Sequence, residues 1–216
     1  MNTVSKLLVS VGASVSLLSA CFTGPRPTLI PEATLPAVSD VAAQSVISLL
    51  EQTSTAPFTI TYEVVTKFGG LHTAVILAYE ASLGTSITIA EVRYIYSADG
   101  TTSTCSTITG SCSPGIDEAR VSDRQLVSTI FKKSAVDRIR QDLRVAVGSS
   151  TGSQISVAGH DATCTAIPVV DANGATQSKT YCAFSAFGVV ATMDTADLAV
   201  TALTYDATVS GEQFAV

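Results

Sequence analysis

The sequence predicts an α+β fold built mainly from antiparallel strands. Runs such as Phe58–Val64 alternate apolar with polar residues, which is the period of a half-buried strand. Short turns rich in Gly and Asp separate these runs, and this favours an antiparallel meander. Two other segments have apolar residues at helical spacing. No period of about 20–50 residues recurs, which disfavours a solenoid or a propeller.

Residues 1–20 have the features of a secretory signal peptide. A short start carries one lysine, an uncharged stretch follows, and small residues lead to a cysteine. The stretch is too short and too rich in Ser and Gly for a transmembrane helix, which needs about 20 strongly apolar residues. The string Leu18-Ser19-Ala20-Cys21 resembles the bacterial lipobox, in which the thiol takes a diacylglycerol before cleavage ahead of it. We expect a lipoprotein signal peptide and lipidation of Cys21; the alternative is an ordinary signal with a chance cysteine.

A proline-rich segment follows, with four of the seven prolines between residues 25 and 36. Proline fixes φ and lacks an N–H donor, so residues 21–39 are predicted to form an extended, semi-rigid tether. Residues 40–216 are predicted to form a single lipoprotein domain, because their number is normal for one core. This organisation predicts an extracytoplasmic protein anchored to a bacterial membrane by its N-terminal lipid, with the membrane and the leaflet left open.

The cysteine count agrees with an oxidising compartment. Of the five cysteines, lipidation of Cys21 leaves four, and an even number in an exported chain indicates two disulfides with three possible connectivities. We choose the sequence-local pairing, Cys105–Cys112 and Cys164–Cys182. The first would close a small loop, and the second would join two neighbouring strands. A zinc site made by the four thiols is the alternative, but their spacings lack a C-x2-C pair, so no metal is expected.

The composition argues against some classes of partner. The chain has 12 Lys and Arg against 18 Asp and Glu, a net charge of −6, which disfavours a general nucleic-acid binder. Hydrophobic residues make up 46% of the chain, enough for a sizeable core or for the lining of a cavity. Aromatic residues make up 6% and tryptophan is absent, which disfavours a sugar-stacking or peptide-binding surface. No cofactor is expected, and the oligomeric state stays open.

The first helix is predicted from a capping signal and from the spacing of apolar residues. Ser39 can cap it, Asp40 suits its first turn, and it should end before Pro57. The strands of the first half are separated by Gly69-Gly70, a two-residue hairpin signal, and by Gly84. These strands are expected over residues 58–64, 71–80, 87–96 and 101–108. In the second half, Gly and Asp separate strands expected over residues 154–157, 162–170, 180–187, 189–193 and 198–208.

The central segment changes to helical spacing. Ser122 can cap a helix that continues through Phe131, and a second stretch reaches Leu143 after a possible break near Ser134. Residues 120–144 hold seven of the 12 cations against three acids. This basic segment could form a face for anionic lipid headgroups. We favour the alternative, a solvated helix face, because amphipathic helices normally have this composition.

No residue set in the sequence makes a convincing catalytic site. Residues 148–152 match G-x-S-x-G, but that motif works at a strand-to-helix turn, and here a helix precedes it and a strand follows. His160 and Asp161 would point to opposite faces of a strand, so a polar turn residue is the better interpretation of His160. His72 lies on a predicted strand among apolar neighbours, where a structural histidine is expected. We therefore expect no catalytic residue and no enzyme activity.

The second half carries short motifs that are similar to those of a known family. They are Cys164 and Pro168 on one strand, Thr180-Tyr181-Cys182, a hairpin around Gly188, and Leu203-Thr204-Tyr205 before the segment 211–214. Together with the lipobox, these motifs resemble the bacterial lipoproteins related to LolA, LppX and LprG. The resemblance implies a curved antiparallel β-sheet, an unclosed half-barrel, with helices packed on or lidding its concave face. It also implies a cavity for acyl chains, but it assigns no individual ligand-binding residue.

The leading hypothesis is a membrane-anchored protein that binds or carries a lipid or other hydrophobic ligand in an apolar cavity. The predicted strand over residues 71–80 is apolar on both faces, so one face could cover helices while the other lines a cavity. The alternative is a cell-envelope interaction or structural module that acts through its surface and has no ligand cavity.

Overall fold

The computed structural model describes residues 40–123 and 125–215. The predicted signal peptide, the tether, Ser39 and the lipidation site Cys21 lie outside the described residues, so they stay predictions. No helix in the described part of the chain is long and apolar enough to span a membrane.

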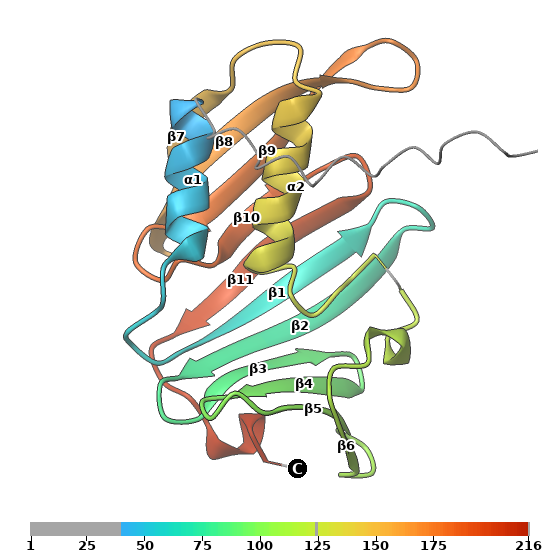
Figure 1. Cartoon of the computed structure of the whole chain (residues 1–216), viewed down its shortest axis with the longest axis vertical. Helices are drawn as coiled ribbons and strands as arrows, with labels where there is room; N and C mark the ends of the chain where they lie inside the picture. Colours follow the sequence, from blue (N-terminus) through green and yellow to red (C-terminus); the bar gives the residue numbers. More distant parts are fainter. Residues whose placement is uncertain (1–39, 124, 216) are drawn as a thin grey trace, which may run out of the picture. The chain divides into compact units, whose positions relative to one another are not determined.

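Eleven antiparallel strands form one sheet in the described residues (Figure 1): β1 (Phe58–Thr66), β2 (Leu71–Glu80), β3 (Gly84–Ile89), β4 (Val92–Ser97), β5 (Thr102–Ser106), β6 (Cys112–Pro114), β7 (Thr151–Val157), β8 (His160–Val170), β9 (Thr176–Phe184), β10 (Val190–Asp194) and β11 (Leu198–Asp206). Their spatial order is β6-β5-β4-β3-β2-β1-β11-β10-β9-β8-β7. A first meander, β1–β6, and a second meander, β7–β11, therefore meet at the central pair β1 and β11. The outermost strands β6 and β7 do not pair with each other, so the sheet is open.

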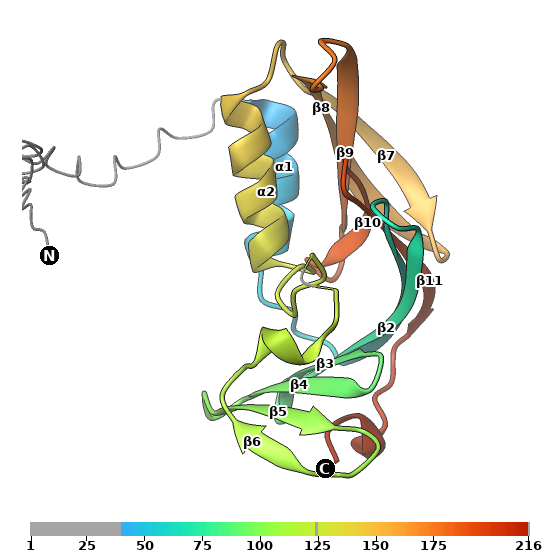
Figure 2. The same ribbon diagram turned by 90° about the vertical axis from the view of Figure 1, so that its right-hand side faces the viewer.

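Two α-helices, α1 (Val41–Glu51) and α2 (Lys133–Arg144), lie on the same face of this sheet (Figure 2). Asp40 is the N-cap of α1, because its carboxylate accepts a hydrogen bond from the Ala43 amide at 3.0 Å. The expectation that Asp40 lies in the first turn is therefore wrong by one position. The open sheet and the two helices confirm the predicted α+β fold, an unclosed antiparallel half-barrel with helices on its concave face.

The concave face holds the core, as the alternation in the sequence predicts. In β1, the side chains of Phe58, Ile60, Tyr62 and Val64 are at most 1% exposed. The Tyr62 hydroxyl donates to the Val190 carbonyl at 2.7 Å, which satisfies the phenol inside the core. Helix α1 adds its apolar face to the same core through Ala43, Val46, Ile47 and Leu50.

The expectation of one strand over residues 87–96 is wrong, because the chain reverses in the middle of it. β3 ends at Ile89, β4 begins at Val92, and these two residues pair with each other. Ala90 has a φ of 50°, so a turn forms here without Gly, Pro, Asn or Asp. Gly84 does not break β2 but begins β3. Its φ is +103°, and a Cβ there would clash with the Tyr96 carbonyl oxygen, so glycine is required.

The central segment is helical only in its second half. Residues 121–123 and 125–132, called here the connecting loop, form turns and bends, so the helix expected from Ser122 is wrong. Helix α2 begins at Lys133 and runs through Ser134, so the break expected near Ser134 is wrong as well. The segment before the connecting loop holds a short 3-10 turn, η1 (Glu118–Arg120).

The connecting loop buries its apolar residues without being a helix. Leu126, Ile130 and Phe131 are at most 2% exposed. The Glu118 carboxylate accepts hydrogen bonds from the Ser128 amide at 3.1 Å and from the Ser128 hydroxyl at 2.9 Å. The Glu118 side chain thus supplies a hydrogen-bond acceptor for a backbone N–H group that in a helix would bond to a backbone carbonyl. This explains how an irregular segment can be buried. The apolar spacing that predicts a helix arises here from the positions that face the core.

The C-terminal segment covers part of the outer face of the sheet. It ends in a 3-10 turn, η2 (Gly211–Gln213). The Gln213 carbonyl accepts a hydrogen bond from the Ser86 hydroxyl at 2.5 Å. The Arg93 guanidinium donates to the carbonyls of Glu212 at 2.7 Å and Ala215 at 2.5 Å. Ser86 is consequently buried, although it lies on the face of β3 opposite the helices.

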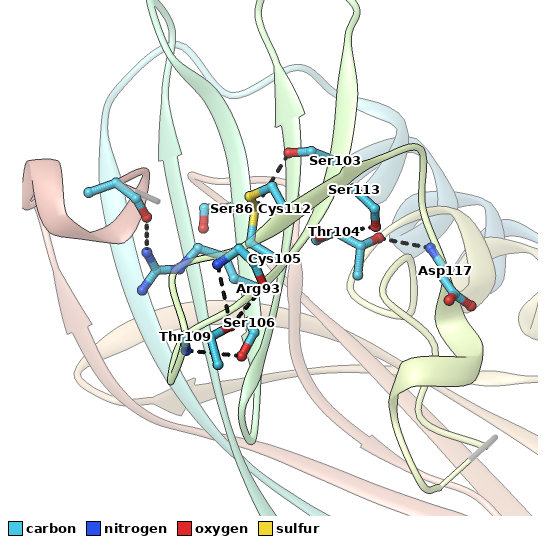
Figure 3. The surroundings of a disulfide bond; sticks show 12 residues. Ser86, Arg93, Ser103, Thr104, Cys105, Ser106, Thr109, Cys112, Ser113 and Asp117 are labelled. Atoms are coloured by element: carbon cyan, nitrogen blue, oxygen red, sulfur yellow. Dashed lines mark hydrogen bonds between the residues drawn. A yellow bond between two sulfur atoms is a disulfide. The ribbon is translucent and has the colours of Figure 1, made fainter.

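Disulfide bonds join Cys105 to Cys112 and Cys164 to Cys182, and each links directly opposite residues of two paired strands. The first closes the hairpin of β5 and β6 (Figure 3). Next to it, the Thr104 hydroxyl accepts a hydrogen bond from the Asp117 amide at 2.8 Å. This contact fixes the end of the hairpin to the chain that leads into η1 and the connecting loop.

Candidate functional site

A cavity of about 430 Å³ borders the concave face of the first meander. It lies between that face, the C-terminal end of α1 and the connecting loop. Cavities of about 300–1,000 Å³ with mainly apolar walls are typical of small-molecule sites. The apolar part of this wall is formed by Leu50, Phe58, Leu77, Ile87, Phe131 and Val189.

Strand register brings the sheet side of the cavity together. Tyr79 pairs with Thr85, and Thr85 pairs with Tyr96, so these three side chains form one row across β2, β3 and β4. Leu77 and Ile87 pair in the adjacent row. All five line the cavity, because residues two apart on a strand share a face.

A chain of hydrogen bonds links the connecting loop, which borders the cavity, to the sheet. The Tyr96 hydroxyl lies 2.6 Å from Ser128 Oγ, which donates to the Glu118 carboxylate at 2.9 Å. Because the Ser128 hydroxyl has only one hydrogen, Tyr96 is the donor in the first contact. Burial raises the pKa of Tyr96, so its phenol keeps this proton at neutral pH. Phe131 of the connecting loop packs against Tyr62, with ring centroids 4.5 Å apart.

The exposed rim of the cavity is polar, and most of its charges are paired. Glu51 and Lys133 line the cavity and are exposed to solvent. The Glu51 carboxylate lies 2.7 Å from the Arg140 guanidinium. The Lys133 ammonium lies 2.9 Å from the carboxylate of Asp137, one helical turn further along α2. Both rim charges are therefore compensated within the protein.

Lys132 also lines the cavity, but its charge is not paired with an acid among the described residues. It forms no ion pair with any described residue, and its ammonium donates to the Gln52 carbonyl at 2.8 Å. Burial lowers the pKa of Lys132 below the ordinary lysine value, because a partly desolvated ammonium without a counter-ion is disfavoured. Among the described residues that line the apolar cavity, Lys132 thus carries a positive charge that no acid compensates.

An aromatic cluster continues from the cavity wall towards the edge of the sheet. The ring of Phe58, which lines the cavity, lies 5.9 Å from the Phe187 ring, and Phe187 stacks on Tyr205 at 4.2 Å. The His160 ring meets Tyr205 edge-on at 4.2 Å and Phe187 at 5.3 Å. The interpretation of His160 as a polar turn residue is therefore wrong: it begins β8 and packs among aromatic rings.

The other candidate residues from the sequence lie apart from the cavity. His72 is exposed on β2, with its Nδ1 3.0 Å from the Glu63 carboxylate, so the expectation of a histidine among apolar neighbours is wrong. The amide and the hydroxyl of Ser150, from the G-x-S-x-G match, both donate to the Asp40 carboxylate at the start of α1. Within residues 40–123 and 125–215 there is no group of three or more His, Cys, Asp or Glu that could hold a metal ion.

Charged contacts fasten α2 over the second meander. The Arg138 guanidinium donates two hydrogen bonds to the Asp197 carboxylate, at 2.9 and 3.0 Å. Asp142, only 5% exposed, accepts from the Tyr181 hydroxyl and from the Lys179 ammonium, each at 2.5 Å. Cations and acids of the basic segment therefore bind other parts of the protein, and the segment is not simply the solvated helix face that its composition favoured.

Sequence reasoning left the ligand-binding residues unknown, although part of the signal was present. The alternation of β2 places Leu77 and Tyr79 on one face, and this face lines the cavity. For Ser128 and Lys132 the sequence holds no comparable signal. Their positions depend on the path of an irregular loop that apolar periodicity wrongly predicts to be a helix.

The described residues thus form an α+β half-barrel with an apolar cavity between the first meander and the connecting loop. No family model matches the chain, and no curated protein matches it. Among solved structures the chain is similar to MucB, with 10% identity, 81% of this chain and 62% of that chain covered, and a TM-score of 0.49. It is also similar to a LolA superfamily protein from Nitrosomonas europaea, with 7% identity, 81% of this chain and 97% of that chain covered, and a TM-score of 0.38. Likeness at these levels supports no conclusion about function.

Proposed function

We propose that this protein binds or carries a lipid or another hydrophobic molecule in its apolar cavity, in the extracytoplasmic space. The observation that supports this function is the cavity of about 430 Å³ with its mainly apolar wall. Moving an alkyl chain from water into such a wall is worth about 0.8 kcal/mol per CH2 group, so a long chain gains enough free energy to bind. The two disulfides agree with an oxidising compartment outside the cytoplasm.

A neutral pyrene-alkane probe tests this function, because its fluorescence changes when it leaves water. Thr85 lines the cavity and is only half-buried, so Thr85→Trp fills the cavity at little cost to the core. We expect Thr85→Trp to weaken probe binding by about tenfold or more, since each lost CH2 contact costs about 0.8 kcal/mol. The matched control is Thr201→Trp, the same change at an exposed position of β11, which should leave binding unchanged.

Thermal unfolding of both variants shows whether they fold. Equal probe binding by Thr85→Trp and the unsubstituted protein would show that the cavity is not the binding site. That result would favour the alternative function, a cell-envelope module that acts through its surface.

We further propose that a lipid on Cys21 anchors the chain to a bacterial membrane. Two or more acyl chains hold a protein stably, whereas one holds it only marginally. Cys21→Ser is expected to release the protein from the membrane fraction or to leave it unprocessed, as cell fractionation and the mass of the chain would report. Ser19→Ala keeps a small residue before the cysteine and should change neither. Unchanged membrane association of Cys21→Ser would contradict the anchor and leave the cavity proposal untouched.

A further inference from the structure

We propose that the cavity takes a ligand with one aliphatic chain and one anionic headgroup, and that Lys132 pairs with this headgroup. The inference rests on the proposed binding function and adds the chemical class of the ligand. It combines the size of the cavity with the charges on its wall.

The volume of the cavity fits one chain. Sites for small molecules typically enclose about 300–1,000 Å³, and the cavity of about 430 Å³ lies near the lower end of this range. We therefore assign one aliphatic chain to it, with its hydrocarbon against the apolar wall.

The charge on the wall selects the headgroup. An ammonium has three N–H donors, and among the described residues Lys132 uses one of them, towards the Gln52 carbonyl. The ammonium is partly desolvated and has no counter-ion in the described chain, an arrangement that costs free energy. A carboxylate or phosphate would accept charge-assisted hydrogen bonds from the remaining donors and remove this cost.

The described residues around Lys132 do not supply the missing negative charge. Glu51 is engaged by Arg140, and the charge of Lys133 is balanced by Asp137. Lys132 is also the N-cap of α2, and its side chain makes no capping hydrogen bond; of the first amides, that of Ser134 donates to the Thr129 carbonyl at 3.1 Å. The N-terminus of a helix favours an anion, so the helix adds to the effect of the ammonium.

Competition for the neutral pyrene-alkane probe tests the inference on the full chain carrying Cys21→Ser, which omits the predicted lipid. The competitors share one chain length and differ in headgroup: hexadecan-1-ol, hexadecanoate and hexadecyl phosphate. We expect at least one anionic competitor to bind about tenfold more tightly than the alcohol, as one partly buried charge pair provides about 1.4 kcal/mol. The stronger of the two identifies the ligand as a fatty acid or as a phosphate-bearing lipid.

Substitutions locate the charge that is responsible. Lys132→Met should reduce the affinity for the anionic competitors to that for the alcohol, and Lys132→Arg should retain the preference. Lys67→Met is the matched control: this lysine is paired with Asp194 and does not line the cavity. It should keep the preference.

The outcomes separate the two proposals. If the alcohol competes as well as both anions, or if Lys132→Met keeps the preference, the headgroup inference is wrong while hydrophobic binding stands. An equal loss in Lys67→Met would likewise contradict a specific role for Lys132. If the probe does not bind, or if Thr85→Trp binds it normally, the binding function itself fails. The competitor series needs no substitution at Lys132, so the headgroup inference stays testable even if Lys132→Met does not fold.

Discussion

The two meanders of the sheet use the same alternation, but different elements cover their concave faces. Over the second meander, α1 contacts β7, β8 and β9, and α2 contacts β8. Over the first meander, strands β2, β3 and β4 face the connecting loop and the end of α1, with the cavity between them. A regular helix presents a continuous apolar face to a sheet, whereas an irregular loop presents separate side chains. This difference explains why the connecting loop leaves a cavity against the first meander, whereas α1 buries its apolar face in the core.

The largest expected effect compares the same truncation in the two halves. Ile47 on α1 is 1% exposed and does not line this cavity, while Ile87 on β3 is 4% exposed and does. Ile47→Ala should lower the free energy of unfolding by about 3–4 kcal/mol, because it leaves a new cavity in close-packed surroundings. Ile87→Ala should cost about 2 kcal/mol, since this side chain already borders empty space. Urea unfolding of the two variants measures both values.

Equal costs at Ile47 and Ile87 would show that the two halves are packed alike. Probe binding should show the opposite ranking of the two variants. Ile87→Ala should alter the affinity for the pyrene-alkane probe, and Ile47→Ala should leave it unchanged once the protein is folded.

Loss of either disulfide should lower stability, but only one of the two losses should change probe binding. In the chain-entropy model, replacing Cys164 and Cys182 by Ser should cost about 3 kcal/mol, and replacing Cys105 and Cys112 somewhat less, because the sequence separations are 18 and 7 residues. The hairpin that carries the shorter loop contacts Asp117, next to the Glu118 that holds the connecting loop. Loss of the Cys105–Cys112 bond should therefore weaken probe binding, and loss of the Cys164–Cys182 bond should not. If loss of the Cys164–Cys182 bond weakened probe binding and loss of the Cys105–Cys112 bond did not, the hairpin would not be what positions the connecting loop.

The strands and their order were largely predictable, because alternation and glycine turns are local signals. The return strand over residues 71–80 and the turn at Gly69-Gly70 follow from such signals. The turn at Ala90 does not, since a left-handed alanine is fixed by the pairing of β3 with β4 and leaves no mark in the sequence. The position of this turn is thus set by the pairing of the two strands and not by local sequence preference.

The candidate site was less predictable than the sheet. Alternation shows which face of a strand points inward, but it does not show whether a helix, a loop or a cavity lies opposite. Lys132 illustrates the limit. In the sequence it belongs to a basic segment that favours a solvated helix face, and in the structure it is partly buried, one residue before α2. Its exposure depends on the connecting loop, whose path is set by long-range contacts such as that between Tyr96 and Ser128.

The smallest expected effect concerns one of the ion pairs that fasten α2 over the second meander, that of Arg138 with Asp197. Partial burial acts to raise the pKa of Asp197, but hydrogen bonds from Thr195 and Arg138 outweigh it, and the pKa lies below the ordinary value of 3.8. A lower pKa in the folded state means that the carboxylate stabilises the fold above pH 3.8 and that this stabilisation is lost as the pH falls through the lowered pKa. Asp197→Asn should therefore cost about 1–2 kcal/mol at neutral pH, and the two stability curves should converge in acid.

Urea unfolding at a series of pH values measures this convergence for Asp197→Asn. Asp194→Asn is the control, because the Asp194 side chain is 64% exposed and its ion pair with Lys67 is open to solvent, so its effect should be smaller. Curves that stay parallel down to acid pH would show that the charge of Asp197 does not hold α2 in place. Helix α2 would then be held over the second meander by its apolar contacts and by the contacts of Asp142 with Tyr181 and Lys179.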